Sequence, residues 1–502
     1  MGTKQAARSW MAKLAAHYEQ TRRRYPDDNL MIIFDIDGTI LDMRYMMLHV
    51  LRGFDREHGT EFFRGLTVED ITVHENHIVQ LLANLGIAPQ HQQQITDWYL
   101  ERRWSSEAIL ESHRPFSGVL DVIRWFQIQP NTYVGLNTGR PDSLRADTLR
   151  SLNEIGKMYR VHFADDLLHM NPRGWEQGVS KAKVEGVRYF QEAGYRIFAI
   201  VDNEPDNLQS VADNIDTGQD VLLLHANTLF ASKRTRLPHQ AVRGNAYDLT
   251  KLIPEKALPR HIQFVWHGVN DAANLRQFLA SDIEWAELDI RMDPWRKDLI
   301  LRHDSFAETS LMDDEDWLAV DEVLARLRQW DRGAKLDLKE GGVLIDRALQ
   351  LVESLGFEDA KLWFNGNVER LQEPGFRKIA DAHPGAILQC PVDFLTPLVC
   401  SAPAKAKEIL DMFQDWGINR FSISWLTDDM REFFDQMDRW GFEVNIYNDP
   451  DLESFLQAVL LMPRSITSDF NFPEWHYYGR GSGQDGDRYE YAIRKPRARK
   501  RK

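Results

Sequence analysis

The sequence predicts an α/β protein made of two successive domains, a parallel-sheet domain with a helical insertion and then a (β/α)8 barrel. Three observations lead to this prediction. The chain has 502 residues, and domains of about 150 residues would make two to four of them. Short apolar runs alternate with helical patterns, which is typical of parallel sheets. In the second half, eight strand–helix units follow one another, the number that closes a barrel.

The composition excludes several classes of protein. Hydrophobic residues make up 43% of the chain, too many for a disordered protein. No apolar run approaches the roughly 18 residues of a membrane-spanning helix, and the N-terminus does not have the pattern of a signal peptide. The two cysteines, Cys390 and Cys400, fit neither a disulfide framework nor a zinc site. We therefore expect a cytoplasmic protein from a reducing compartment.

The charge is unevenly distributed along the chain. The net charge is −15, yet seven of the nine residues in 494–502 are Lys or Arg. Residues 476–502 are expected to form a flexible basic tail, because glycines lead into a block of like charge. Such a tail could contact nucleic acid or acidic lipid, although a solvated tail is the favoured interpretation.

The first domain is predicted over residues 29–255, after a surface helix within residues 1–28. Strand patterns are found at 30–34, 132–136 and 196–201. Residues 42–114 are rich in helix formers and contain no convincing strand, so an all-helical insertion is expected there. The carboxyl ends of parallel strands meet at one edge of the sheet. The residues that follow these strands are therefore the first candidates for a site.

Acidic, hydroxyl and basic side chains follow the strands of this domain in a definite order. Asp35 and Asp37 come directly after the first strand, where Gly38 permits a tight turn and the two carboxylates can converge. A carboxylate there can bind Mg²⁺ or attack phosphorus. The later members are Thr138, then Lys181 and Lys183, and then Asp202 and Asp206. A hydroxyl and an ammonium group in this setting suit the binding of a phosphate.

Residues 29 to about 250 resemble the haloacid dehalogenase superfamily, which has a Rossmann-like parallel sheet. Its four motifs correspond here to residues 34–39, Thr138, Lys181 or Lys183, and Asp202 with Asp206, and residues 115–120 resemble the stretch that precedes its second motif. The resemblance implies that Asp35 is the nucleophile and that Asp37 is the general acid/base, which favours a phosphatase over a dehalogenase. It also implies Mg²⁺ bound by Asp35, Asp202 and the backbone carbonyl of Asp37, supported by Asp206. Lys181 is slightly preferred as the motif lysine, and Lys183 is kept as the alternative.

The insertion at residues 42–114 lies between the first and second motifs. In that superfamily such an insertion is a cap that closes over the site and selects small substrates. A lid that excludes water strengthens the electrostatic interactions beneath it. The cations best able to meet a substrate anion are Arg44, Arg102, Arg103 and Arg114. Each of them individually fits a surface arginine better.

The barrel is predicted over residues 256–475, after a linker at 252–259. Its strands are expected at 262–266, 285–290, 334–338, 361–364, 386–389, 420–425, 443–447 and 465–470. The extended residues 298–302 are expected to form a hairpin arm after the second strand. Functional residues of such barrels lie at the carboxyl ends of the strands.

The barrel strands carry a second set of chemical groups. Glu287 and Asp289 alternate onto one side of their strand, which is costly inside a barrel unless a cation lies between them. Asp337 could supply a third oxygen to a hard divalent cation. His267 and His303 could act as general base and general acid across a phosphodiester.

Residues 261 to about 475 resemble the phospholipase-C-like phosphodiesterase barrels of the TIM type. The His, Glu-x-Asp, His-Asp and acid-x-Lys pattern of glycerophosphodiester phosphodiesterases corresponds to His267, Glu287 with Asp289, His303 and Asp337 with Lys339. The menorin family is the most similar, through Trp-His-x-x-Asn, Lys-Leu-Asp-x-Lys and Leu-Trp-x-Asn. Gly268 replaces the usual Arg, and Asp337 replaces the usual Glu. The resemblance implies a barrel cation, Mg²⁺ or Ca²⁺, and a catalytic Lys339.

The leading hypothesis from the sequence is a bifunctional hydrolase of small phosphorylated metabolites. A Mg²⁺-dependent phosphomonoesterase would be joined to a metal-dependent phosphodiesterase-like barrel. One alternative is a nucleic-acid end-processing phosphatase that uses the basic tail. Another is a phosphatase whose barrel is a catalytically silent binding module.

Overall fold

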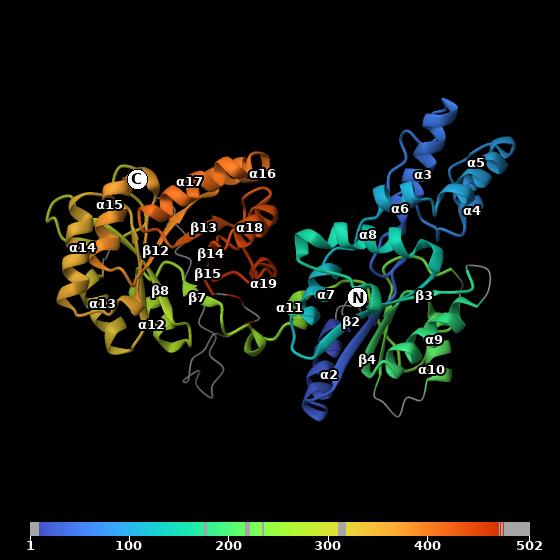
Figure 1. Cartoon of the computed structure of the whole chain (residues 1–502), viewed down its shortest axis with the longest axis horizontal. Coiled ribbons are helices and arrows are strands. Elements are labelled where there is room, and N and C mark those ends of the chain that lie inside the picture. Colours follow the sequence, from blue (N-terminus) through green and yellow to red (C-terminus); the bar gives the residue numbers. More distant parts are fainter. Residues whose placement is uncertain are drawn as a thin grey trace, which may run out of the picture. The chain divides into compact units, whose positions relative to one another are not determined.

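The computed structural model describes most of the chain. The described residues are 10–174, 178–215, 221–232, 235–309, 318–470, 472 and 475. The chain divides into two compact units, Met1–Pro254 and Glu255–Lys502. Both are α/β units, which confirms the predicted fold class (Figure 1). The predicted basic tail lies outside the described residues.

The first unit contains a six-stranded parallel sheet in the order β3-β2-β1-β4-β5-β6. The strands are β1 (Asn29–Phe34), β2 (Thr132–Pro141), β3 (Leu168–Asn171), β4 (Tyr195–Asp202), β5 (Leu222–Ala226) and β6 (Val242–Gly244). β1 is central, and its residues after Asn29 are all buried. The predicted strands correspond to β1, β2 and β4, while the short β3, β5 and β6 lie at or near the edges and were not predicted.

Helices cover both faces of this sheet. They are α2 (Trp10–Arg24), α7 (Val119–Gln127), α8 (Arg145–Gly156), α9 (Val179–Glu192), α10 (Pro205–Asn214) and α11 (Leu249–Leu252). One face of α2 is firmly packed, because Trp10, Met11 and Leu14 have no exposed surface. The ring of Trp10 lies over Gly244, where a Cβ atom would come within 2.0 Å of it. The helix expected at the surface is therefore part of the core on one side.

Four helices form the insertion between β1 and β2. They are α3 (Met43–His58), α4 (Ile78–Asn84), α5 (Pro89–Arg102) and α6 (Ser106–Ser112), and Figure 1 shows α3, α4 and α5 extending away from the sheet. The two connections to the core run side by side. The N–H of Asp42 donates to the carbonyl of Arg114 at 2.9 Å, and the N–H of Phe116 donates to the carbonyl of Ile40 at 2.9 Å. We call these four helices and their loops the cap.

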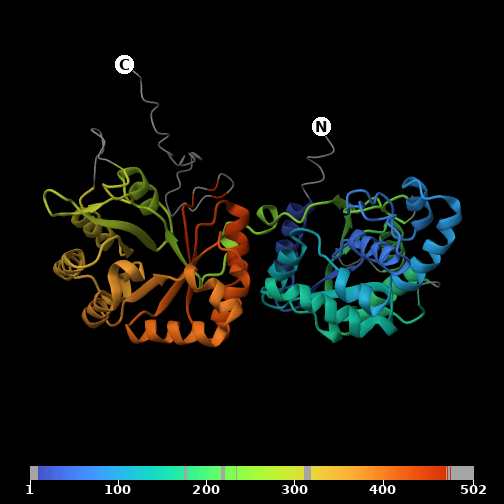
Figure 2. The same ribbon diagram turned by 90° about the horizontal axis from the view of Figure 1, so that it is seen from above.

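The second unit is a closed barrel of eight parallel strands, as predicted (Figure 2). The strands are β7 (Gln263–Trp266), β8 (Trp285–Met292), β10 (Gly333–Leu338), β11 (Leu362–Asn365), β12 (Ile387–Pro391), β13 (Arg420–Ser424), β14 (Val444–Tyr447) and β15 (Ser465–Ser468). Pairing of β10 with β8 closes the ring. The short β9 (Leu299–Leu301) runs antiparallel to β8, which is the hairpin arm expected from the sequence.

Helices surround the barrel, and its interior is polar. The helices are α12 (Ala272–Ala280), α13 (Val320–Gln329), α14 (Val343–Ser354), α15 (Val368–Ala382), α16 (Thr396–Ser401), α17 (Pro403–Asp415), α18 (Met430–Arg439) and α19 (Leu452–Leu460). The buried polar side chains on the strands include Lys335, Gln389, Arg420, Asn445 and Thr467. Barrels of this type are more often filled by branched apolar residues. Within the described residues of both units, no helix is long and apolar enough to cross a bilayer.

Candidate active sites

The first candidate site lies where β1 and β4 end. The N–H of Asp35 donates to the carbonyl of Val201 at 2.9 Å, so the parallel pairing continues into the site. The chain then turns at Gly38, which has a φ of 74°. A Cβ atom at Gly38 would lie 2.3 Å from Nδ2 of Asn203. Both the backbone angle and the close approach of Asn203 therefore require glycine here.

A buried lysine joins the carboxylates of the two strands. The Nζ atom of Lys183 lies 2.6 Å from Oδ1 of Asp35 and 2.9 Å from Oδ2 of Asp202. It also donates to the carbonyl of Asn137 at 2.6 Å. Burial lowers the pKa of Lys183, but the charges of Asp202 and Asp35 outweigh it, and the net pKa is raised. Lys183 is therefore held as a cation between two acids.

The other candidate lysine lies elsewhere. Lys181 is exposed on α9, whereas Lys183 is 3% exposed. Residues two positions apart on a helix point in directions about 200° apart, so only one of the two can face the sheet. The structure thus brings Lys183 to the carboxylates and leaves the slightly preferred Lys181 at the surface. The sequence context favoured Lys181 because it follows Val179 and Ser180 directly, but the register of α9 decides the direction.

The two oxygens of Asp35 have different surroundings. The N–H of Ile36 donates to Oδ1 at 2.7 Å, and Lys183 contacts the same atom. Among the described residues this leaves Oδ2 as the oxygen available for a reaction. Burial raises the pKa of Asp35 to about 8; the charges of Asp202 and Asp37 add to this rise, and Lys183 opposes it. A second cation would favour the ionised form.

The remaining predicted residues lie around this cluster. Oδ1 of Asp202 accepts the N–H of Glu204 at 2.8 Å, and Asn207 donates to both of its oxygens. Asp206 lies in the first turn of α10 and is partly exposed. Thr138 is fully buried, and its hydroxyl oxygen accepts the N–H of Arg140 at 3.2 Å.

The first site offers the oxygen ligands that a hard divalent cation requires. Asp35 and Asp202 are buried carboxylates, and Oδ1 of Asn203 is buried without a hydrogen-bond partner among the described residues. Oxygen ligands of this kind suit Mg²⁺. Asn203 was not singled out from the sequence, where an Asn between two acids carries no separate signal.

Asp37 is held by an arginine that sequence reasoning did not select. Nε of Arg140 donates to Oδ2 of Asp37 at 2.9 Å, and Nη2 donates to Oδ1 at 2.5 Å. Arg140 is fully buried. It follows Gly139 in the second motif, where only the hydroxyl and the backbone were expected to matter. A forked pair of this kind fixes the plane of the carboxylate.

The cap reaches the first site through a histidine. Nε2 of His74 lies 3.2 Å from Oε1 of Glu204, and its Nδ1 lies 3.2 Å from Oε2 of Glu75. The four arginines suggested as anion contacts all have partners within the protein. Arg44 pairs with Asp42, Arg102 lies over the ring of Trp98, Arg103 donates to Asn76, and Arg114 donates to the carbonyl of His113.

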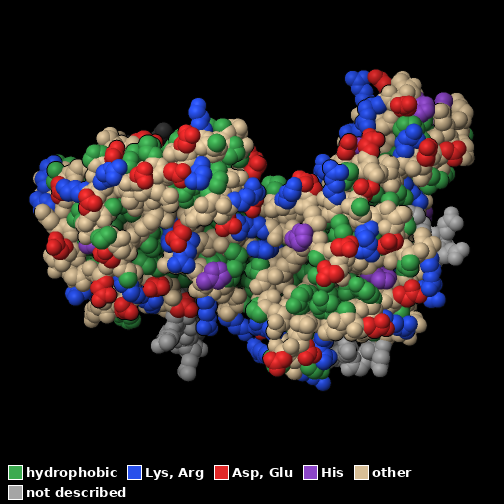
Figure 3. All heavy atoms as spheres, viewed as in Figure 1, with side chains coloured by type: hydrophobic (Ala, Val, Ile, Leu, Met, Phe, Trp, Pro, Cys, Tyr) green, Lys and Arg blue, Asp and Glu red, His purple; other side chains and the backbone are tan. Residues whose placement is uncertain are grey.

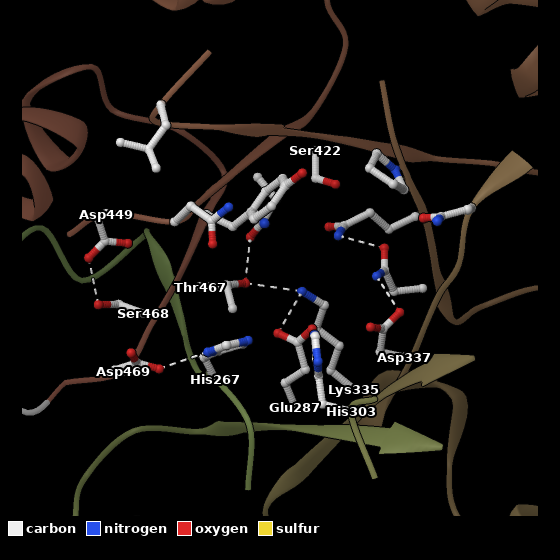
Figure 4. Close-up of a pocket in the computed structure, with 18 of the residues that line it drawn as sticks. His267, Glu287, His303, Lys335, Asp337, Ser422, Asp449, Thr467, Ser468 and Asp469 are labelled. Carbon is white, nitrogen blue, oxygen red and sulfur yellow. Dashed lines mark hydrogen bonds and ion pairs between the residues drawn. The ribbon is translucent and has the colours of Figure 1, made fainter. Parts of the chain in front are cut away.

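The second candidate site is a cavity of about 520 Å³ at the carboxyl ends of the barrel strands (Figure 4). Five of the predicted residues line it, namely His267, Glu287, His303, Asp337 and Lys339. The register pairs Asp289 of β8 with Asp337 of β10. Ligand atoms of Glu287, Asp289 and Asp337 all lie within 4.8 Å of one another. Glu287 and Asp289 are 6% and 1% exposed, so this cluster needs a balancing cation.

Two lysines provide positive charge to this cluster. Nζ of Lys339 lies 2.8 Å from Oδ1 of Asp289 and also donates to Asp337. Nζ of Lys335 lies 3.2 Å from Oε2 of Glu287 and donates to the hydroxyl of Thr467 at 3.0 Å. Burial raises the pKa of Asp337, whereas the charge of Lys339 outweighs burial at Asp289 and lowers its pKa. Lys335 was not selected from the sequence, although it shares the strand of Asp337.

The two barrel histidines are each oriented by an aspartate. Nδ1 of His267 lies 2.7 Å from Oδ1 of Asp469, which follows β15, and Figure 4 shows the two side chains facing each other. Nδ1 of His303 lies 2.8 Å from Oδ1 of the adjacent Asp304. Burial opposes protonation of His267, but the hydrogen bond to Asp469 and the charge of Glu287 raise its pKa to about 9. Asp469 was not predicted, because its partner lies some two hundred residues earlier in the chain.

Gly268 departs from the pattern of the resembling diesterases for a backbone reason. Its φ is 63°, in the left-handed region that strains other residues.

Two side-chain amides contact the acids on the inner wall of the site. Asn270 donates to Oδ2 of Asp289 at 2.5 Å, and Asn365 donates to Oδ1 of Asp337 at 2.8 Å.

Neither a protein-family model nor a curated protein matches the sequence. Solved structures of two kinds match it in part. A phosphodiesterase from Oleispira antarctica, in complex with the product sn-glycerol-3-phosphate, is 17% identical, covers 44% of this chain and 95% of its own, and has a TM-score of 0.33. A glycerophosphodiester phosphodiesterase from Agrobacterium tumefaciens is 14% identical over 41% of this chain and 96% of its own, with a TM-score of 0.29.

The other kind is represented by a haloacid dehalogenase family hydrolase from Deinococcus radiodurans with bound phosphate and sodium. It is 12% identical, covers 40% of this chain and 81% of its own, and has a TM-score of 0.26. These are the two kinds of protein that the motifs resemble.

The two arrangements permit different chemistry. The first offers one carboxylate oxygen for attack, a second carboxylate beside it and a buried ammonium group. The second offers three clustered acids and two histidines whose Nε2 atoms remain for proton transfer. A carboxylate nucleophile suits a phosphomonoester, and a pair of imidazoles across a cation suits a phosphodiester.

Proposed function

We propose that the first unit is a Mg²⁺-dependent phosphomonoesterase that works through an aspartyl phosphate on Asp35. The observation that supports this most directly is Lys183, which joins Asp35 and Asp202 and leaves Oδ2 of Asp35 without a partner among the described residues. Asp37 follows two residues later, on the same turn. The ammonium group of Lys183 would donate hydrogen bonds to the phosphate oxygens, and it would remain positively charged throughout the reaction.

Asp35 and Asp37 have complementary tasks in the proposed reaction. Oδ2 of Asp35 attacks phosphorus, and the bond from phosphorus to the leaving oxygen breaks. Asp37 gives its proton to that oxygen and then takes one from the water that hydrolyses the aspartyl phosphate. The carboxylate of Asp35 is restored, and inorganic phosphate leaves.

A magnesium ion would be held by Asp35, Asp202 and the backbone carbonyl of Asp37, with Asp206 in support. It would neutralise charge on the phosphate oxygens. We infer that Thr138 binds a phosphate oxygen through its hydroxyl. The cap would close over a small phosphorylated metabolite, because His74 already connects it to Glu204 of the core.

We further propose that the barrel is a metal-dependent phosphodiesterase and the whole chain a bifunctional hydrolase. Glu287, Asp289 and Asp337 would hold Mg²⁺ or Ca²⁺, which would polarise the phosphoryl group. His267 and His303 would transfer protons on either side of the diester, and Lys339 would neutralise charge. The 520 Å³ cavity is of a size suited to a small polar diester.

The test uses the full chain with Mg²⁺ and panels of phosphate monoesters and diesters. Asp35→Asn is expected to abolish release of phosphate from monoesters and to leave diester cleavage unchanged. His267→Ala is expected to do the reverse. Equal loss of both activities in either variant would show that the two sites are not independent, and inactivity of the wild-type protein on every ester would overturn the proposal.

One observation favours a barrel that binds ligands without cleaving them. Lys339 contacts both Asp289 and Asp337, so an ammonium group already lies between two of the three acids, where an ion would bind. Calorimetric titration with Mg²⁺, Mn²⁺ and Ca²⁺ separates the two possibilities. Binding that is lost in Asp289→Asn supports the phosphodiesterase, and absence of binding at millimolar metal supports the silent barrel.

A further inference from the structure

Arg140 connects the proposed acid/base Asp37 to the cap. Arg140 lies at the end of β2 and has no exposed surface. Its Nε and Nη2 atoms donate to the two oxygens of Asp37, at 2.9 and 2.5 Å. The guanidinium group of Arg140 can only donate, and one oxygen of Asp37 still accepts from it when the other oxygen carries a proton. The carboxylate of Asp37 is consequently fixed in one plane.

The other hydrogen bonds of Arg140 reach the core helix α8 and the end of the cap. Nη1 donates to the hydroxyl of Thr148 on α8 at 3.0 Å. Nη2 also lies 3.1 Å from Nε2 of His113, which follows the last cap helix. Because Arg140 can only donate, Nε2 of His113 must accept, and the imidazole is neutral. Its Nδ1 then carries the proton and donates to the hydroxyl of Ser151 at 2.7 Å.

The cap also places an aromatic ring next to Arg140. The ring of Trp104, which lies between α5 and α6, is 5.2 Å from the guanidinium carbon of Arg140. The helix α6 packs against α8, and Ser106 donates to Asp147 at 2.5 Å across this contact. Any rotation of the cap about its two connections therefore changes the surroundings of Arg140.

We propose that Arg140 is a positioning residue that aligns Asp37 for proton transfer and that the cap controls this alignment through Trp104 and His113. The inference rests on the proposed phosphatase activity of the first unit. Arg140 does not touch the substrate in this arrangement. Its effect is exerted on the direction in which Asp37 presents its proton to the leaving oxygen, and later on the direction in which Asp37 accepts a proton from water.

The test compares two aryl phosphates on the full-length enzyme with Mg²⁺. Phenyl phosphate needs a proton on its leaving oxygen, whereas p-nitrophenyl phosphate has a leaving group that departs as the anion. Arg140→Lys keeps the charge and removes the fork. We expect it to lower kcat/KM for phenyl phosphate at least about ten-fold more than for p-nitrophenyl phosphate, because a misaligned acid matters only where a proton is needed.

Arg145→Lys is the matched control, since Arg145 also pairs with two acids in the same region but is 30% exposed and points to Asp142 and Asp165. It is expected to leave both substrates unchanged. Trp104→Leu should show the same substrate dependence as Arg140→Lys to a smaller degree. The double variant should be no worse than Arg140→Lys alone, because both changes act on one alignment.

The outcomes separate this inference from the proposed function. If Arg140→Lys lowers kcat/KM equally for both substrates, Arg140 has only a structural role, and the proposal that it aligns Asp37 is wrong. Normal kinetics in Trp104→Leu would contradict the claim that the cap controls the alignment of Asp37. Should Arg140→Lys fail to fold in a thermal melt, Thr148→Val removes one hydrogen bond from Arg140 with little change of shape, and its ratio of the two kcat/KM values decides. Inactivity of the wild-type enzyme would instead overturn the phosphatase proposal itself.

Discussion

Among single residues of the first unit, Lys183 is the one whose removal is expected to affect both activity and stability. Its ammonium group is the cation between Asp35 and Asp202. Lys183→Ala is expected to reduce monoesterase activity by about 100-fold or more, because a preorganised charge at the phosphate is lost. It also leaves two buried acids without their partner, at a cost of about 3–5 kcal/mol in unfolding free energy.

The exposed Lys181 is the control for this prediction. Lys181→Ala should change neither kcat nor the midpoint of urea unfolding. Steady-state kinetics and urea titration of both variants make the comparison. A larger loss in Lys181→Ala than in Lys183→Ala would mean that the register of α9 in the active enzyme differs from the one described.

His113 makes the stability of the first unit depend on pH. Burial, together with the charges of Arg140 and Arg114, lowers its pKa to about 2, well below the value near 6.5 of an unfolded chain. Below pH 6.5, His113 therefore becomes protonated in the unfolded state but stays neutral in the native state. The stabilising contribution is complete above that pH and declines as the pH falls, by at most about 1.4 kcal/mol per pH unit.

His113→Gln keeps an acceptor for Arg140 and removes this titration. The difference in unfolding free energy between the wild type and the variant should shrink steadily from pH 7 to pH 5. Urea unfolding at half-unit steps of pH measures it. A difference that stays constant would show that the pKa of His113 is the same in the folded and unfolded states.

Asp469 orients His267 in the barrel. Asp469→Asn is expected to keep the fold and to lower diesterase kcat/KM by about 100-fold or more, because the neutral amide no longer stabilises the protonated imidazole and can turn its NH2 group toward Nδ1. The raised pKa of His267, about 9, should fall in the variant because its main partner loses its charge. NMR titration of the imidazole follows this change directly. An unchanged pKa would contradict the role of Asp469.

At the scale of elements, α2 joins the start of the chain to the end of the first unit. Trp10 is fully buried, and its indole N–H donates to the carbonyl of Ala246 at 2.6 Å. Trp10→Ala is expected to lower the unfolding free energy of the first unit by about 3–5 kcal/mol, with cavity formation as the cause. Lys13→Ala, on the exposed face of the same helix, should have no effect in the same urea titration.

Elements with a strong local pattern could be predicted from the sequence, and those that depend on neighbours could not. Thr132–Pro141 and Trp285–Met292 are long strands with apolar runs and were recognised. Val242–Gly244 is three residues long, and its glycine is needed only because Trp10 lies above it. The burial of one side of α2 was likewise hidden, since an amphipathic helix does not indicate what it packs against.

The same distinction holds for the sites. Residues within short motifs, such as Asp35 and Glu287, could be found from their spacing. Arg140 and Asp469 could not be assigned roles, because their partners Asp37 and His267 are far away in sequence. The choice between Lys181 and Lys183 depended on the rotation of a helix, which a single motif does not specify.

For the whole molecule, the predicted two-part α/β architecture is confirmed, and each unit has its own set of buried or partly buried acids. The sets lie on different sheets, Asp35 and Asp202 on one and Glu287, Asp289 and Asp337 on the other. On the face of the barrel unit that Figure 3 shows, acidic and basic side chains are interspersed, without a large area of one sign.

Because of its internal lysines, the barrel is expected to fold whether or not a metal ion is bound. Lys335 and Lys339 already supply two positive charges to the three carboxylates of Glu287, Asp289 and Asp337, so the fold of the interior depends little on an added ion. Treatment with EDTA should stop diester cleavage and shift the melting temperature of the second unit by no more than a few degrees. A barrel that unfolds on chelation would contradict this, and calorimetry distinguishes the two results.

The same lysines would compete with the metal ion proposed for the barrel. An ion that enters between Asp289 and Asp337 must displace an ammonium group, which then becomes free to turn toward an incoming phosphate. Metal and substrate would thus favour each other's binding, and each would be held weakly alone. An enzyme of this proposed design would remain inactive at low metal concentration and would respond steeply once both are present.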